Sequence, residues 1–140
     1  MNDESSAGAR NILSIDASKV EACTLVGRPL DWAVAKAIGR EDMAAMVLKY
    51  PESNVFCPSS RWIDGGPVLE AHATEIHREA GRWWVANDAH AEAGSTLLAA
   101  AMRLVVATRL GPVIEIPAGL AVLMKTIEKL EIATGARARP

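Results

Sequence analysis

The chain has 140 residues, the size of one domain, and half of them are hydrophobic, which suffices for a buried core. Its 15 Lys and Arg against 17 Asp and Glu give a formal net charge of −2, a balance that does not support nucleic acid as a partner. No apolar stretch approaches the roughly 20 residues of a membrane-spanning helix. The first ten residues also lack the apolar core of a signal peptide. We therefore expect a cytoplasmic protein without membrane contact.

The predicted elements begin after a polar leader, residues 1–18. An apolar run at residues 20–26 is compatible with a strand that ends in a turn. A helix is predicted next, with Pro29 at its first position, where a missing N–H costs nothing. Asp31 then falls in the first turn, where the helix dipole favours a carboxylate, and Gly39 ends the helix.

The middle of the sequence predicts a helix followed by a long loop. Residues 41–49 favour a short helix that must end before Pro51. Residues 50–67 hold three prolines and two adjacent glycines, so we expect no regular element there. This loop carries Tyr50, Phe56 and Trp62, and a long loop in a compact domain is more often functional than idle. Residues 67–73 fit either a short helix or an extended segment.

The second half predicts a hairpin and a buried helix. Residues 82–86 form a strand candidate, and residues 75–79 could pair with it across an Ala-Gly turn. Of the adjacent Trp83 and Trp84, one should enter the core because their side chains point to opposite faces of a strand. Residues 96–110 are apolar on nearly every side, which predicts a central buried helix capped by Ser95.

A short strand at residues 113–116 and an amphipathic helix at residues 118–134 complete the prediction. One face of that last helix carries Leu120, Leu123, Ile127 and Leu130, which we expect to pack on the domain or on a second copy, so a homo-oligomer is expected. The predicted class is α+β: a single small domain with a central buried helix, surrounding helices and a small antiparallel sheet. We divide it into a core at 19–117, the added helix at 118–134 and a tail at 135–140.

Three blocks of the sequence are similar to a known family. They are Leu30–Ala37, the run Cys57-Pro-Ser-Ser-Arg-Trp-Ile-Asp-Gly-Gly-Pro-Val-Leu-Glu70, and Leu97–Arg103 followed by Leu110-Gly and Val113–Pro117. In order and spacing they resemble the NinX-like family of small phage and prophage proteins. The sequence departs from the family pattern at Cys57, where Ser is common, and in its leader and C-terminal helix. The resemblance implies a phage or prophage origin and action in the cytoplasm of a bacterium, and it implies no known reaction.

The residues themselves indicate no catalytic constellation. The three histidines lack the spacing of paired metal ligands, and no base is placed near Cys57, so we expect neither an enzyme nor a metal or other cofactor. Cys23 and Cys57 are expected to be unpaired thiols.

The candidate ligand-binding residues are Asp31, Ser59, Ser60, Trp62, Gly65, Gly66 and Arg103. Gly65 and Gly66 suggest either a turn with positive φ or free N–H groups that bind an anion at a helix start. Arg103 is the one charge within Leu97–Thr108 of the apolar helix, so it should form a salt bridge with Asp31 or Glu70 or hold an anionic ligand. Trp62 could stack on a planar ligand, or anchor the loop by burial.

Two functions follow from these residues. In the first, the loop and Arg103 bind a small anionic or planar ligand of nucleotide type. In the second, the chain is a protein-interaction module that self-associates and modulates a host protein, with no small ligand. The position of the loop relative to Asp31 and Arg103 should discriminate between them.

Overall fold

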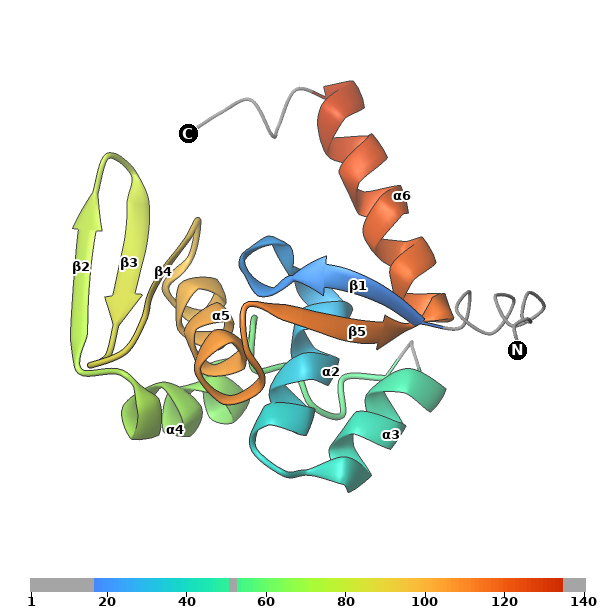
Figure 1. Cartoon of the computed structure of the whole chain (residues 1–140), viewed down its shortest axis with the longest axis horizontal. Helices are drawn as coiled ribbons and strands as arrows, with labels where there is room; N and C mark the ends of the chain where they lie inside the picture. The colour runs from blue at the N-terminus through green and yellow to red at the C-terminus, as the bar shows by residue number, and fades with distance from the viewer. Residues whose placement is uncertain (1–16, 51–52, 135–140) are drawn as a thin grey trace, which may run out of the picture.

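The computed structural model describes residues 17–50 and 53–134 and confirms a single small α+β domain. Figure 1 shows its elements, which follow one another along the chain as β1 (Ala17–Glu21), the 3₁₀ turn η1 (Ala22–Thr24), α2 (Gly27–Ala37), α3 (Glu41–Lys49), α4 (Trp62–His72), β2 (Glu75–Glu79), β3 (Arg82–Ala86), β4 (Ala91–Gly94), α5 (Leu97–Leu110), β5 (Val113–Pro117) and α6 (Ala118–Thr134).

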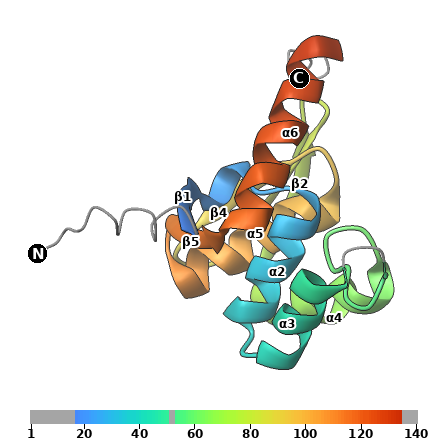
Figure 2. The same ribbon diagram turned by 90° about the vertical axis from the view of Figure 1, so that its right-hand side faces the viewer.

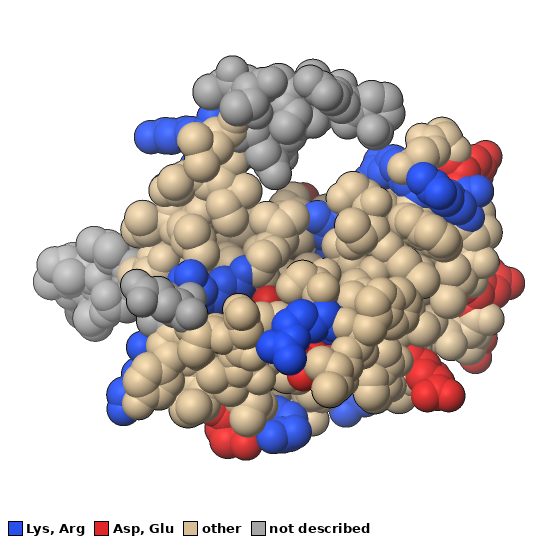
Figure 3. Space-filling view, turned by 180° about the vertical axis from the view of Figure 1, so that it is seen from behind, with Lys and Arg blue, Asp and Glu red and all other residues tan. Residues whose placement is uncertain are grey.

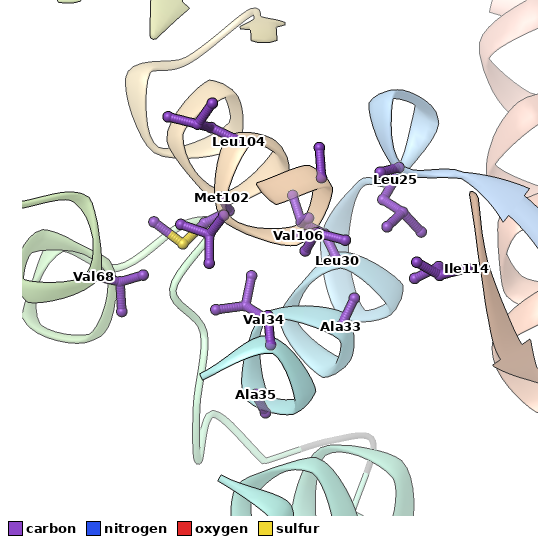
Figure 4. Packing of buried hydrophobic residues seen from close by; sticks show 14 of the residues in the cluster. Leu25, Leu30, Ala33, Val34, Ala35, Val68, Met102, Leu104, Val106 and Ile114 are labelled. Atoms are coloured by element: carbon purple, nitrogen blue, oxygen red, sulfur yellow. The ribbon is translucent and has the colours of Figure 1, made fainter. Parts of the chain in front are cut away.

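Helix α5 is the centre of the hydrophobic core, as its uniformly apolar sequence predicts. It packs against α2, α4, η1 and the strands β3 and β4. Its residues Met102, Leu104, Val105 and Val106 are fully buried. Figure 4 shows Leu30 and Val34 of α2 directed toward α5 from one side and Val68 of α4 from another. Burial of most of its residues between Leu98 and Ala107 explains why this helix has no polar face.

Two small antiparallel sheets flank this helix, where the sequence predicted one. Strands β1 and β5 pair from Ala17 with Pro117 to Glu21 with Val113. Strands β2, β3 and β4 form the second sheet in that order. Strand β4 was not predicted because its sequence, Ala-Glu-Ala-Gly, lacks the branched and aromatic residues typical of strands.

The hairpin of β2 and β3 is confirmed, with the two-residue turn at Ala80 and Gly81. Both residues have positive φ, +55° and +78°, as in the type I′ turn that matches strand twist. Trp83 packs against the core, and Trp84 points to the opposite face, where it stacks on His77. The prediction that the two indoles diverge is therefore confirmed.

Several predicted boundaries are wrong. Residues 17 and 18 of the predicted leader belong to β1, while residues 1–16 and the predicted tail at 135–140 lie outside the described residues. Helix α2 begins two residues before Pro29. The cap of α5 is Thr96 rather than Ser95, since the Thr96 hydroxyl accepts the Ala99 N–H. The predicted helix at 41–49 and the strand at 113–116 are confirmed, the strand running one residue further to Pro117.

Helix α6 packs its first turns on the body. Leu120 and Ala121 are buried against the core, and Met124 packs partly on it. Beyond this point the helix rises away from the rest of the molecule (Figures 1 and 2). Within the described residues, no helix is both long and apolar enough to cross a membrane.

Candidate functional site

Asp31 of α2 and the loop before α4 are in direct contact. The Ser59 backbone N–H donates to Asp31 Oδ1 at 2.8 Å, and the Ser59 hydroxyl is a second partner of the carboxylate. Asp31 is 6% exposed, and this burial raises its pKa from 3.8 to about 6, although both Ser59 hydrogen bonds oppose the shift. The structure therefore joins two predicted site residues, and their contact fixes the loop to α2.

A second carboxylate holds the same loop from the other side. Asp64, in the first turn of α4, accepts the Cys57 N–H at Oδ2 over 2.9 Å. Arg61 donates from Nη1 to the Asn54 carbonyl at 2.7 Å. The backbone N–H groups of Ser60 and Arg61 both donate to the Cys57 carbonyl. These bonds tie backbone groups of the loop to one another and to α4, which restricts its conformation.

The apolar anchors of the loop are Phe56 and Pro58, which are buried. Gly65 lets α4 approach them, because a Cβ at this position would collide with the Pro58 carbonyl oxygen and press on Leu98. The alternative in which Trp62 is the buried anchor is wrong, since its side chain is 58% exposed.

Gly65 and Gly66 lie inside α4, so the predicted break at these positions is wrong. Neither glycine has the positive φ of the predicted turn. The Gly65 N–H donates to the Arg61 carbonyl at 2.8 Å and is not free for an anion. Pro67 lies within α4 and has no N–H to donate to the carbonyl of Ile63, four residues earlier. Ile63 and Pro67 are both exposed, so water can reach this carbonyl. Residues 67–72 are thus helical, and β2 follows at Glu75.

Arg103 and Asp31 have different partners. Arg103 donates from Nε to the Leu25 carbonyl at 2.9 Å and from Nη1 to the Ala93 carbonyl at 2.8 Å. Burial raises the pKa of the Glu92 carboxyl, and the Arg103 charge lowers it in part. Asp31 bonds Ser59, and Glu70 is exposed on α4. Instead of the predicted salt bridge, Arg103 thus connects the approach to α2 with β4.

The outward side of the site is a short exposed run at the start of α4. Ser60, Arg61, Trp62 and Ile63 are all exposed, and we call them the 60–63 surface. Ile63, at 75%, is the most exposed large hydrophobic side chain of the described residues. Sequence reasoning singled out Trp62 and missed Ile63, because the loop was expected to extend beyond it.

Both cysteines are free thiols, as predicted. Burial is the main cause that raises the pKa of the Cys57 thiol, and the Asp31 charge adds to it. A raised pKa keeps a thiol protonated and weakly nucleophilic. Cys57 therefore contributes its backbone N–H to the loop rather than an activated sulfur.

Fold and site together define a small α+β domain in which a buried helix supports an internally bonded, aromatic-bearing loop. A sequence model of the family described as Bacteriophage P22, NinX matches residues 21–109. This match covers more than half of the chain, and the chain belongs to that family of bacteriophage proteins. It includes Asp31, the loop and Arg103, and it ends before β5 and α6. No curated protein matches the chain.

Proposed function

We propose that this chain is a protein-interaction module that contacts its partner through the 60–63 surface. The observation that carries the proposal is the exposure of Trp62 and Ile63 directly after a loop whose backbone is held by Asp31 and Asp64. Large apolar side chains in a fixed conformation are typical of interface hot spots, because little conformational entropy is lost on binding. Arg61, exposed beside them, belongs to the residue types that interfaces favour.

The geometry supports a small anionic ligand at this site less well. Of the groups that would hold an anion, Arg103 donates to two backbone carbonyls, and the Gly65 N–H donates within α4. Ser59 bonds Asp31, a carboxylate that would repel an anion. Of the predicted ligand-binding residues, Trp62 presents an exposed aromatic ring. Such a ring favours a partner with an apolar surface of its own.

A capture experiment tests this proposal. Immobilised wild-type chain should retain a defined protein from a bacterial lysate, while the Trp62→Ala and Ile63→Ser variants should lose it. The matched control is Leu48→Ser, which removes an exposed apolar side chain from α3, and it should retain the protein. Equal capture by all four chains would contradict the proposed surface.

The nucleotide-ligand alternative has its own test, a thermal-shift panel of mononucleotides and dinucleotides. The interaction module predicts no shift in the melting temperature of the wild-type chain. A saturable shift that disappears in both Ser60→Ala and Arg103→Met would establish the ligand function instead.

A further inference from the structure

Two carboxylates on different helices hold the same short segment, residues 57–61. Asp31 of α2 accepts the Ser59 N–H at 2.8 Å, and Asp64 of α4 accepts the Cys57 N–H at 2.9 Å. Asp31 is the more buried of the two, at 6% exposed, and has lost most of its hydration. A carboxylate in such a position costs free energy when it is ionised. The segment is therefore held on α2 by a group that is better accommodated there when it is neutral.

The charged and titratable groups around Asp31 come from α2, from α4 and from the segment itself. Burial is the main cause that raises the pKa of the Asp31 carboxyl, and the charge of Asp64 on α4 raises it further. Arg28, three positions earlier on α2, lowers the Asp31 pKa in part. From the segment, the Cys57 thiol lies near enough for the Asp31 charge to raise its pKa, to which burial contributes more. An ionised Asp31 thus meets a repelling carboxylate as well as an attracting cation.

Protonation of Asp31 preserves its contact with Ser59. A neutral carboxyl still accepts the Ser59 N–H through its carbonyl oxygen. Its O–H can donate to the Ser59 hydroxyl, which is the second partner of Asp31 and serves as donor or acceptor. The proton therefore removes a buried charge without leaving a polar group unsatisfied.

The segment can leave α2 without disrupting its own hydrogen bonds. The backbone N–H groups of Ser60 and Arg61 donate to the Cys57 carbonyl, so these bonds move with the segment. The bonds between Ser59 and Asp31 join residues 28 positions apart and must break. Proteins open locally in such units at a lower cost than global unfolding. The contact with Asp31 is thus the tie whose strength controls local opening.

We propose that Asp31 and residues 57–61 form a pH-sensitive latch: protonation of Asp31 holds the segment on α2, and ionisation of Asp31 lets it open locally while the rest of the domain stays folded. The open form is a minor one at every pH, because the fully buried Pro58 must also leave the core. The latch itself does not depend on any partner. Its control over the 60–63 surface, into which the segment leads, rests on the proposed function.

Linkage gives the sign and size of the effect. The closed form buries the carboxyl and binds its proton more tightly than the open form, in which water solvates it. The Asp31 pKa is about 6 in the closed form, and we take the ordinary value of 3.8 for the open form. The equilibrium constant for opening should then rise roughly 25-fold between about pH 4.5 and 7.5.

Amide hydrogen exchange of the full chain, followed by NMR across this pH range, tests the latch. Each exchange rate is divided by the intrinsic rate at its pH, so that the ratio reports the opening equilibrium. The Ser59 amide should be much less protected than the amide of Val105, which is buried in α5 and exchanges on global unfolding. Protection of the Ser59 amide should also fall roughly 25-fold as the pH rises from about 4.5 to 7.5.

Two variants assign this pH dependence to Asp31. Asp31→Asn keeps an acceptor for the Ser59 N–H but has no proton to lose, so protection of its Ser59 amide should not change with pH. The matched control is Asp42→Asn, which removes an exposed carboxylate from α3 and should behave as the wild type does.

The wild-type chain alone can overturn the proposal. Equal protection of the Ser59 and Val105 amides would show that the segment opens only when the whole domain unfolds. Protection of the Ser59 amide that is independent of pH would also overturn it, as would a wild-type pH dependence in Asp31→Asn. None of these outcomes involves a partner, so failure of the latch is distinct from failure of the proposed function.

Discussion

Asp31 is the one charged residue that is buried among those the structure describes. Its carboxylate is retained in the interior because it accepts two hydrogen bonds from Ser59, and these fix the loop to α2. The rise of its pKa from 3.8 to about 6 corresponds to a cost of about 3 kcal/mol for keeping it ionised in the folded chain. The hydrogen bonds from Ser59 to Asp31 thus fix the loop, while the buried ionised carboxylate lowers the free energy of unfolding at neutral pH.

The first prediction concerns this pH dependence. The folded chain binds the Asp31 proton more tightly than the unfolded chain does. The resulting stabilisation is complete below about pH 4 and is lost as the pH rises through about 6. Asp31→Asn has no such proton and should abolish this part of the dependence, while Asp31→Ala should destabilise the chain by about 1–3 kcal/mol, because the Ser59 N–H loses its acceptor. Urea denaturation from pH 4 to 8 measures both effects. An Asp31→Asn variant with the wild-type pH profile would show that the carboxyl is not buried as described.

The adjacent glycines of α4 provide a matched pair of substitutions. A Cβ at Gly65 collides with the Pro58 carbonyl, which is backbone and cannot rotate aside, so Gly65→Ala should destabilise the chain by about 1–3 kcal/mol. At Gly66 a Cβ meets only the Trp62 ring at an ordinary 3.5 Å. Gly66→Ala should therefore be neutral or stabilise the helix by up to about 1 kcal/mol. Thermal denaturation of both variants compares them, and equal destabilisation would rule out the close approach at Gly65.

Arg103 has a structural role in this account. Arg103→Met removes two charge-assisted hydrogen bonds to the Leu25 and Ala93 carbonyls and should destabilise the chain by about 2–4 kcal/mol. Because the bonds join the approach to α2 with β4, amide hydrogen exchange should speed up first in β4. If Arg103→Met were as stable as the wild type, Arg103 would again be a candidate ligand-binding residue.

At the scale of elements, the β2–β3 turn contains a strained residue. Ala80 adopts φ +55°, a left-handed conformation that costs a residue with a Cβ roughly 1 kcal/mol or more, whereas Asn tolerates it well. Ala80→Asn should therefore stabilise the chain by about 0.5–1 kcal/mol, and Gly81→Ala should destabilise it. Chemical denaturation measures both variants. A destabilising Ala80→Asn would contradict the turn geometry.

The elements that the sequence predicted well are those whose own residues determine them. Helix α5 is apolar on all sides, and the β2–β3 hairpin combines alternating strands with an Ala-Gly turn, so local patterns suffice. Helix α4 was misplaced because Gly65, Gly66 and Pro67 break helices in isolation. Here Gly65 is required by the nearby Pro58, and Asp64 bonds back to Cys57, contacts that depend on the folded chain.

The candidate site was predicted in part for the same reason. The sequence singled out Asp31, the loop and Trp62, and the structure brings Asp31 and Ser59 together. The sequence could not reveal that Arg103 donates to two carbonyls, because the Ala93 carbonyl belongs to a strand that was not predicted. The residue types predicted a polar cluster, whereas the choice of partners within it depends on tertiary geometry.

At the scale of the whole molecule, the start of α4 and the outer part of α6 lie far apart. The 60–63 surface begins α4, at the lower left of Figure 1, and the outer part of α6 rises at the upper right. Figure 3 shows both basic and acidic side chains among uncharged ones on the face seen from behind.

The most direct test of the interaction function is site-specific photo-crosslinking in bacterial cells. A benzophenone amino acid replaces Ile63, the most exposed apolar side chain of the 60–63 surface, and a control chain carries it at Leu48 of α3. We expect a discrete crosslinked protein, identifiable by mass spectrometry, at position 63 alone, and its loss when Trp62→Ala is added. The same adducts at both positions, or no protein adduct at position 63, would contradict it.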